Sequence, residues 1–531
     1  MNPALALAHI TAGPLSHIAA GPLSHIAAGP LSHLAAGPLS HLAAGPLGQV
    51  KAIGNVLLDV LGNAILVYFL VLNSSFLVLI LFATLEFARY LRRLPFAGYD
   101  ETYTSPLTDP VSVLVPAYNE ASGIVAAVQA MLALRYPRYE VVVVDDGSTD
   151  GTLDRLVEAF GLVPSSRVIP ADLPMRGAIT SVHVPASGTS SLTVVRKENG
   201  GKTDALNTAI NVARYPLVCM VDADSLLDPD ALLAVAKPFA DDPVRVVATG
   251  GVVGVVNGCQ TRAGRVVDVR MPRRWLARIQ VAEYLRAFLL GRTGFSRLDS
   301  LVVISGAFGL FRRDLVVEVG GLDPDCIGED AELVVRLHKH LRRSGLASGE
   351  YRIRFVAEPV SWSEVPETLG VLGHQRRRWH RGISEILIKH RAMIGNPRYG
   401  RIGLVVLPYY VLFEALAPVI ELAGLVLVPL GLVFGLVDLA FAGKFLLVAY
   451  GYAIVVTLTA LLVEEFSFRR YHRWRDLLSM VAASILENFG YRQLTAWWRV
   501  RGLWAALRKK QQHWGVMTRV GFEPAAERSS R

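Results

Sequence analysis

Acidic side chains follow three short, valine-rich runs of the sequence. The runs and the residues after them are Val111–Val115 with Pro116-Ala-Tyr118-Asn-Glu120, Val141–Val144 with Asp145-Asp146, and Leu217–Val221 with Asp222-Ala-Asp224. Such runs predict buried strands of a parallel sheet. Because ligands of open α/β sheets bind in the crevice at the carboxyl ends of the strands, these side chains lie where a ligand is expected.

Asp222 and Asp224 have the spacing of a metal site. Alternation along an extended backbone sends both carboxylates the same way, and such a pair is a hard oxygen site. Mg²⁺ or Mn²⁺ binds one or two carboxylates together with substrate phosphates, which a nucleotide diphosphate supplies. Gly200-Gly201-Lys202 predicts a flexible turn whose lysine approaches phosphate. The pattern therefore predicts a divalent cation and a phosphorylated ligand.

Several of these residues also have simpler interpretations. Asp145 and Asp146 could accept hydrogen bonds from a base or a ribose, whereas Thr149 or Asp150 could cap a helix that begins near Leu153. Glu329 and Asp330 fit the acidic first turn of a helix. The basic run Gln375–Trp379 would, taken alone, be an interfacial anchor before a membrane helix.

The elements that must position these residues form one soluble unit, residues 100–395, in which short strands alternate with helical patterns. This arrangement predicts an α/β domain with a mostly parallel sheet. The stretch Gly161–Thr193 is rich in Pro, Ser and Gly and predicts a surface loop.

Apolar segments flank the soluble unit on both sides. Residues 53–90 predict one transmembrane helix, or a tight pair if Asp59 is tolerated, and residues 402–465 predict two helices, or three if the first is split at its prolines. Arg89, Arg92 and Arg93 place the end of the first helix in the cytosol. Residues 469–531 predict an interfacial amphipathic segment, Leu477–Trp498, and a cytosolic tail.

Composition agrees with a membrane protein. The 531 residues are 52% hydrophobic and only 19% charged, and the mean hydropathy is +0.38, which excludes a disordered chain and disfavours a purely soluble one. A net charge of +9 suits acidic headgroups or phosphate-bearing substrates, although positive loops beside membrane helices give the same excess. The three cysteines indicate neither a disulfide framework nor a zinc site.

The first 50 residues repeat an eight-residue unit, A-A-G-P-L-S-H-I/L, that returns His17, His25, His33 and His41. Each Gly-Pro pair interrupts a helix, so the repeat predicts a disordered tract. Metal binding by the histidines is the alternative, although the repeat offers no carboxylate to hydrogen-bond the histidine rings and orient them toward a metal.

Seven motifs occur in one order between Val111 and Gly382: V-S-V-L-V-P-A-Y-N-E, V-V-V-V-D-D-G-S-T-D, N-G-G-K-T-D-A-L-N, D-A-D, S-G-A-F-G-L-F-R-R, G-E-D and Q-R-R-R-W. Together they resemble the successive motifs of membrane-integrated family 2 glycosyltransferases. The last motifs are similar to those of the processive synthases of cellulose, chitin, hyaluronan and poly-N-acetylglucosamine. The resemblance implies a GT-A-like, Rossmann-like nucleotide-sugar-binding domain flanked by transmembrane helices.

The resemblance also implies a role for each motif. Nucleotide-sugar binding falls to Pro116, Tyr118, Glu120, Asp145, Asp146, Lys202 and Asp222. Asp222 and Asp224 would hold Mg²⁺ or Mn²⁺. Asp330, with Glu329 beside it, takes the position of the catalytic base. The acceptor side and the gate over the donor fall to Ser305, Gly306, Gln375, Arg378 and Trp379.

The expected activity is inverting, metal-dependent transfer from a nucleotide-diphosphate sugar, namely a uridine diphosphate sugar, to a polysaccharide that grows at the cell membrane and is exported. The expected partners are the donor, a glycan or lipid acceptor, membrane lipids and an unidentified export partner, but no nucleic acid. One alternative is transfer of a single sugar to a lipid or short acceptor. Another is a transporter whose soluble part senses nucleotide, which Glu414 and Glu421 in an apolar segment suggest.

Overall fold

A computed structural model describes residues 46–93, 99–188, 191–262, 264–468, 471 and 473–508. The octapeptide repeat therefore lies outside the described residues. The chain divides into two units, one formed by Ile65–Val426 with Gly443–Arg531 and the other by Met1–Ala64 with Leu427–Ala442. All of the site residues discussed below belong to the first.

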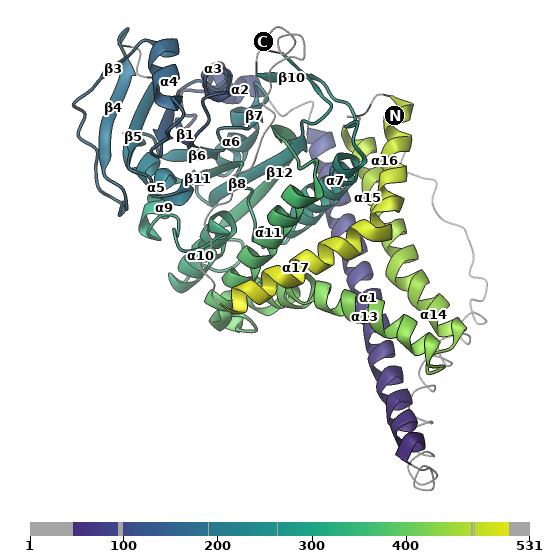
Figure 1. The fold of residues 1–531 in the computed structure, drawn as a ribbon. Coiled ribbons are helices and arrows are strands. Elements are labelled where there is room, and N and C mark those ends of the chain that lie inside the picture. Colours follow the sequence, from purple (N-terminus) through teal and green to yellow (C-terminus); the bar gives the residue numbers. More distant parts are fainter. Residues whose placement is uncertain are drawn as a thin grey trace, which may run out of the picture. The chain divides into compact units, whose positions relative to one another are not determined.

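A ten-stranded sheet lies at the centre of the larger unit, with the strand order β3-β4-β5-β2-β1-β6-β11-β8-β12-β7 (Figure 1). The strands are β1 Val111–Ala117, β2 Tyr139–Asp145, β3 Leu162–Pro164, β4 Ile179–Pro185, β5 Leu192–Lys197, β6 Leu217–Val221, β7 Leu226–Leu227, β8 Val246–Val255, β11 Phe308–Arg312 and β12 Arg352–Ser363. A short hairpin, β9 Gln260–Arg262 with β10 Arg265–Asp268, stands apart.

The centre of the sheet is parallel, as the sequence predicts. β5, β2, β1 and β6 run in one direction, and β11 enters antiparallel between β6 and β8. Within β2, Val142 and Val144 pack on one face and Val141 and Val143 on the other, so both faces are buried. The mixed sheet with helices on both faces confirms the predicted α/β fold class.

Helices pack on both faces of the sheet. The α-helices of the α/β part of the larger unit are α2 Tyr99–Thr104, α3 Ile124–Leu132, α4 Thr152–Phe160, α5 Lys202–Val212, α6 Ala231–Asp241, α7 Trp275–Tyr284, α8 Arg292–Arg297, α9 Arg313–Glu318, α10 Glu329–Arg343 and α11 Leu369–Lys389. Residues of α5 and α10 join the core on one face of the sheet, and residues of α3, α4 and α6 join the core on the other. The π-helix η3, Leu285–Gly291, separates α7 from α8.

The prediction of a surface loop at Gly161–Thr193 is wrong in part. This stretch contains β3 and β4, and β4 pairs antiparallel with β5. Val182 is the one buried residue of β4, whose other residues are partly or fully exposed. Pro170 and Pro174 lie in the connection between β3 and β4, whereas Pro164 and Pro185 are the last residues of these two strands.

Three helical segments are long and apolar enough to cross a membrane: Val60–Arg89, Ile402–Val433 and Leu439–Ser467. The first lies within a single continuous helix, α1 Pro46–Arg93, and not a tight pair. The second is broken at Leu416, between η7 Val411–Ala415 and α13 Ala417–Val433. Its other parts are η6 Ile402–Val406 and α12 Leu407–Tyr410, and the third comprises α14 Leu439–Leu446, η8 Leu447–Gly451 and α15 Tyr452–Phe468.

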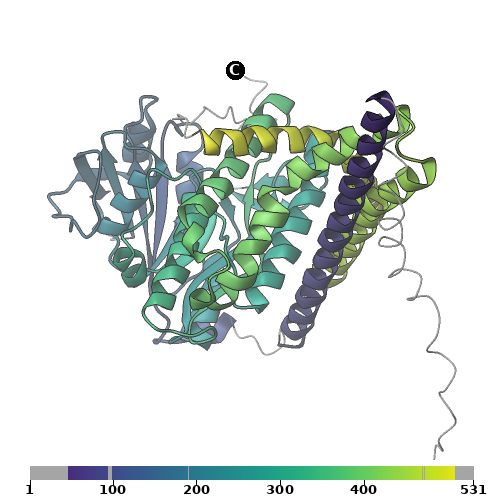
Figure 2. The same cartoon turned by 90° about the horizontal axis from the view of Figure 1, so that it is seen from below.

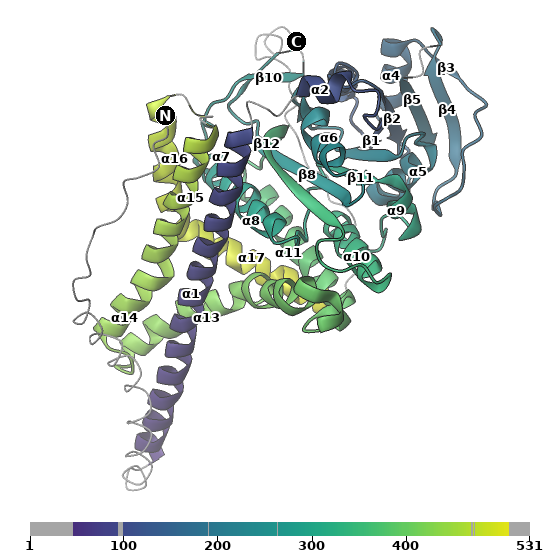
Figure 3. The same cartoon turned by 180° about the vertical axis from the view of Figure 1, so that it is seen from behind.

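The segment after the third candidate span forms two helices, α16 Trp474–Leu486 and α17 Arg492–Leu507. Between them Phe489 and Gly490 leave the helical conformation, so the chain bends sharply there. α16 packs against α7 and α15 (Figure 3), and α17, the yellow helix in Figure 2, packs along α11. The two helices therefore link α7 and α11 of the α/β part to α15 of the third candidate span.

Candidate functional site

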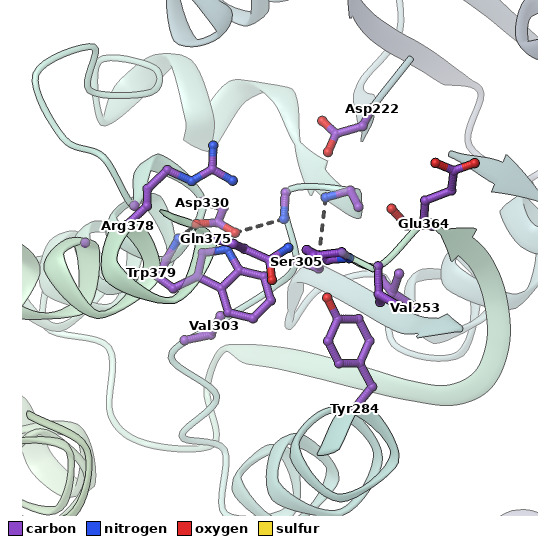
Figure 4. Close-up of a pocket in the computed structure, with 18 of the residues that line it drawn as sticks. Asp222, Val253, Tyr284, Val303, Ser305, Asp330, Glu364, Gln375, Arg378 and Trp379 are labelled. Carbon is purple, nitrogen blue, oxygen red and sulfur yellow. Dashed lines mark hydrogen bonds between the residues drawn. The ribbon is translucent and has the colours of Figure 1, made fainter. Parts of the chain in front are cut away.

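A cavity of about 770 Å³ opens at the carboxyl end of β6, between the start of α10 and one side of α11 (Figure 4). It collects most of the residues that the motifs single out. Those that line it are Lys202, Asp222, Asp224, Ser305, Gly306, Glu329, Asp330, Gln375, Arg378 and Trp379. Separate stretches of the sequence thus meet in one place, which is the position expected for the ligand of an α/β sheet.

Lys202 lies at the centre of the acidic side of the cavity. Its Nζ is 2.5 Å from Oδ1 of Asp222 and 3.8 Å from Oε1 of Glu329. Burial acts to lower the lysine pKa, but the charges of Asp222 and Glu329 outweigh it and raise that pKa. The ammonium is therefore a fixed positive charge at the end of β6, where it can meet a phosphate.

Glu329 is the first residue of α10 and is almost completely buried. Burial raises the pKa of its carboxyl to about 7, with Lys202 acting to lower it and Asp330 to raise it. A carboxyl with a pKa near neutral, inside a cavity and beside other charges, is typical of functional sites.

Asp330 is held in place by the backbone. The Gly306 N–H donates to its Oδ2 at 2.9 Å, and the Ala331 N–H donates to its Oδ1 at 2.8 Å. Each carboxylate oxygen keeps a further lone pair for a ligand. The Ser305-Gly306 turn and the candidate base are therefore direct neighbours, as Figure 4 shows.

One face of α11 forms the wall opposite α5 and β6. Gln375, Arg378 and Trp379 point into the cavity from successive turns. α11 approaches α10 closely, because a Cβ on Gly382 would lie 3.1 Å from the Gly328 nitrogen. The glycine at this position sets the distance between the candidate base and the wall.

Trp379 is braced by two neighbours. Its ring centroid is 6.2 Å from that of Tyr284, and the Arg376 guanidinium lies over the indole at 4.7 Å. Arg376 itself pairs with Glu283 at 2.8 Å. A rigid indole in a cavity wall offers the flat apolar surface on which a sugar ring stacks.

The predicted metal ligands are two carboxylates on one strand exit. No group of three or more His, Cys, Asp or Glu residues able to hold a metal occurs among the described residues. The pair nevertheless fits Mg²⁺ or Mn²⁺, because these ions complete their coordination with waters and substrate phosphates. Asp222 already faces a cation in Lys202, so a metal would share that carboxylate.

Asp146 has a different environment from the cavity residues. Its carboxylate accepts hydrogen bonds from the Gly200 and Gly201 N–H groups at 3.0 and 2.7 Å and from Lys197 Nζ at 2.8 Å. Lys197, fully buried, also pairs with Asp204 at 2.6 Å. Asp146 thus holds the Gly200-Gly201 turn in place. Lys202 follows this turn, and its side chain lines the cavity.

The remaining predicted residues gather at the exits of β1 and β2. Pro116 and Ala117 pair with the end of β2, where Asp145 accepts a hydrogen bond from the Ser148 N–H at 3.0 Å. Tyr118 is half exposed, and the Glu120 N–H donates to Thr152 Oγ1. The structure therefore separates the predicted site into a cavity and a neighbouring strand-exit surface.

The cavity also contains residues that the sequence did not suggest. Tyr284 and Arg292 lie on either side of the π-helix η3, and Figure 4 shows Tyr284 across the cavity from Asp222. Burial lowers the pKa of Arg292 to about 10. The segment between these two residues is a π-helix, a conformation frequent at functional sites, and it is visible only in the structure.

Comparisons with known proteins identify the family to which this α/β domain belongs. Residues 217–486, which are 270 of the 531, match Glycosyl transferase family group 2, and residues 112–174 match Glycosyl transferase family 2. The chain belongs to this family of glycosyltransferases.

The chain is homologous to poly-beta-1,6-N-acetyl-D-glucosamine synthase. It is 31% identical over 281 residues to that protein of Staphylococcus aureus, covering 52% of this chain and 56% of the relative. To the Staphylococcus epidermidis protein it is 27% identical over 279 residues, with the same shares covered. The chain thus spans little more than half the length of the curated relatives it matches.

Solved structures with a detectable likeness include the mannosyltransferase PcManGT from Pyrobaculum calidifontis, in complex with GDP-Man and Mn²⁺. It has a TM-score of 0.44 and 19% identity, covering 83% of this chain and all of that one. S. aureus TarS 1–349 in complex with UDP-GlcNAc has a TM-score of 0.36 and 17% identity, covering 77% and 94%. At these TM-scores neither likeness bears on the site.

Proposed function

We propose that the chain is an inverting, metal-dependent glycosyltransferase that uses a nucleotide-diphosphate sugar, specifically a UDP-sugar, to elongate a polysaccharide at the membrane. One observation carries this proposal: the cavity holds Lys202 and the Asp222–Asp224 pair on one side and Asp330 with Trp379 on the other. The homology to a polysaccharide synthase supports the same reaction.

Donor binding follows from the charges at the end of β6. Asp222 and Asp224 would hold Mg²⁺ or Mn²⁺, which when bound offsets the charge of the diphosphate. Lys202 supplies a second positive charge beside them. At the exits of β1 and β2, Tyr118 and the Asp145-Asp146 turn would border the nucleoside. Asp146 accepts hydrogen bonds from the Gly200 and Gly201 N–H groups and so supports the turn before Lys202.

Sugar transfer then needs one proton acceptor. Asp330 takes the proton of an acceptor hydroxyl, the hydroxyl oxygen forms a bond to the anomeric carbon, and the bond from that carbon to the diphosphate oxygen breaks. The nucleoside diphosphate leaves on the face opposite the attack, so the configuration inverts. The Gly306 N–H keeps the Asp330 carboxylate oriented, and Trp379 supplies a stacking surface for the acceptor.

The candidate spans would anchor the enzyme as a multi-pass protein of the cell membrane with its catalytic domain in the cytosol. Arg89, Arg92 and Arg93 at the end of the first span support this orientation through the positive-inside rule. Export of the growing polymer, with or without a further partner, is part of the proposal. The transporter alternative is not adopted, because Glu414 and Glu421 are ion-paired to arginines.

The test is polymer synthesis by the purified full chain. The protein is incubated with Mg²⁺ or Mn²⁺ and each of a panel of radiolabelled nucleotide sugars, and the products are sized on a gel. We expect long products from one UDP-sugar and none after chelation of the metal. Transfer that stops after one sugar would favour the single-transfer alternative, and polymer made equally well in chelator would refute metal dependence.

A further inference from the structure

Two carboxylates within the second candidate span pair with arginines of α17. Oε1 of Glu421 lies 2.6 Å from Nε of Arg492, and Oε2 of Glu414 lies 3.1 Å from Nη2 of Arg499. The two arginines are seven residues apart and therefore share one face of α17. Because a charge in an apolar span is costly unless it is paired, these contacts fix α17 to the span.

α17 also interlocks with α11. A Cβ on Gly373 of α11 would lie 2.8 Å from Cε2 of Trp498, and a Cβ on Gly502 of α17 would lie 3.2 Å from the Arg381 nitrogen. One glycine on each helix thus allows the two to approach closely. In addition, Nε of Arg499 donates to Nδ1 of His380 at 3.3 Å. Arg499 therefore contacts the span and α11 at once.

A second link joins the start of α17 to the same helix. The Tyr491 hydroxyl, one residue before α17, donates to Glu283 Oε2 at 2.7 Å, and Arg376 of α11 donates to the same oxygen at 2.8 Å. Arg376 lies over Trp379. Gln375 and Trp379, which flank Arg376 on α11, line the cavity.

We propose that α17 is a positioning element. It transmits the location of the second candidate span to α11, and its ion pairs with Glu414 and Glu421 hold the Gln375–Trp379 wall at the distance from Asp330 that the acceptor needs. The intramembrane carboxylates are then anchors of the catalytic domain and not a path for ions. The effect on acceptor use rests on the proposed function, whereas the mechanical coupling does not.

The test reverses one ion pair and then restores it. The variants are Arg492→Glu, Glu421→Arg, the double variant with both changes, and the conservative Arg492→Lys. Arg501→Glu is the matched control, because Arg501 is an exposed arginine of the same helix. For each full-length protein, kcat is measured per donor-binding site, and donor KM and product length are measured alongside it. Hydrogen exchange of residues 369–389 is followed by mass spectrometry.

Each single reversal should lower kcat by about 10- to 100-fold, since a misplacement of about 1 Å costs up to that factor. Donor KM should change less than twofold, products should shorten, and exchange in 369–389 should rise. Arg492→Lys and the double variant should recover at least a third of wild-type kcat, and the control should match wild type.

Single variants with wild-type exchange in residues 369–389 would overturn the proposal, as would a double variant no better than the singles. A loss of donor binding in step with kcat would indicate general unfolding and would equally overturn it. If the wild type makes no product from any donor, the proposed function fails, while the exchange measurement still decides whether α17 holds α11.

Discussion

Replacing Glu329 by Gln should change how stability depends on pH. Burial raises the pKa of the folded-state carboxyl to about 7 from an ordinary value of 4.5. Between these two pH values the folded protein keeps a proton that the unfolded chain has released, so stability falls as pH rises. A shift of one pKa unit corresponds to about 1.4 kcal/mol, and the difference between 7 and 4.5 therefore gives ~3 kcal/mol.

Gln cannot ionise, so Glu329→Gln should lack this loss. From pH 4.5 to pH 8 the variant should gain ~3 kcal/mol relative to wild type, which at roughly 2–4 °C per kcal/mol is about 6–12 °C in Tm. The assay is thermal unfolding of the purified protein in detergent, followed by tryptophan fluorescence at a series of pH values. The Tm of the variant is compared with that of wild type at each pH. The difference isolates Glu329, because the other titrating groups contribute equally to both proteins.

Glu332, one turn further along α10, is the matched control with the opposite sign. Burial acts to raise its pKa, but hydrogen bonds from His390 and Lys389 and the charge of Arg336 outweigh burial and lower the pKa to about 2. Its ionised form stabilises the protein above pH 4.5, and this stability is lost progressively as pH falls from 4.5 to 2. Glu332→Gln should therefore destabilise by ~3 kcal/mol throughout pH 5–8.

The reasoning about the cavity charges is refuted by one result in particular. If Glu329→Gln and wild type keep a constant difference in Tm from pH 4.5 to pH 8, the Glu329 carboxyl titrates at its ordinary pKa. The site would then lack the buried carboxyl that the structure indicates.

Three further predictions concern single residues. Lys197→Met should lower the free energy of unfolding by about 3–5 kcal/mol, because it leaves the buried Asp146 and Asp204 without their shared cation, and a Tm equal to wild type would contradict this. Trp379→Ala should reduce transfer to the acceptor about tenfold with donor KM unchanged, while Trp379→Phe keeps most activity; equal loss in both would argue against stacking. Asp224→Asn should raise the Mn²⁺ concentration for half-maximal activity about tenfold or more, whereas an unchanged metal titration would remove Asp224 from the metal site.

Local patterns predicted the strands and their polar exits well. The valine runs of β1, β2 and β6 are buried on both faces, so their residues report directly on a parallel sheet. Asp222, Asp224 and Lys202 come together because strand exits of one sheet face the same crevice. Their roles in catalysis remain predictions.

Features that depend on distant partners could not be predicted. β4 is a strand because β5 offers it an edge, and its own residues do not distinguish it from a loop. The buried Lys197 resembles a surface lysine in the sequence, since only the fold places Asp146 and Asp204 around it. In the same way, Tyr284 and Arg292 enter the cavity through the course of η3.

The most direct test of the central claim is the rate of nucleoside diphosphate release from the preferred nucleotide sugar by wild type, Asp330→Asn and the control Asp325→Asn. Asp325 shortly precedes Asp330 in the sequence, but its side chain is exposed and pairs with Arg176. We predict that Asp330→Asn lowers kcat by a factor of about 10²–10⁴ while donor binding is retained, because the base is lost and the donor side is intact. A variant with wild-type kcat would contradict the assignment of this cavity as the active site with Asp330 as its base.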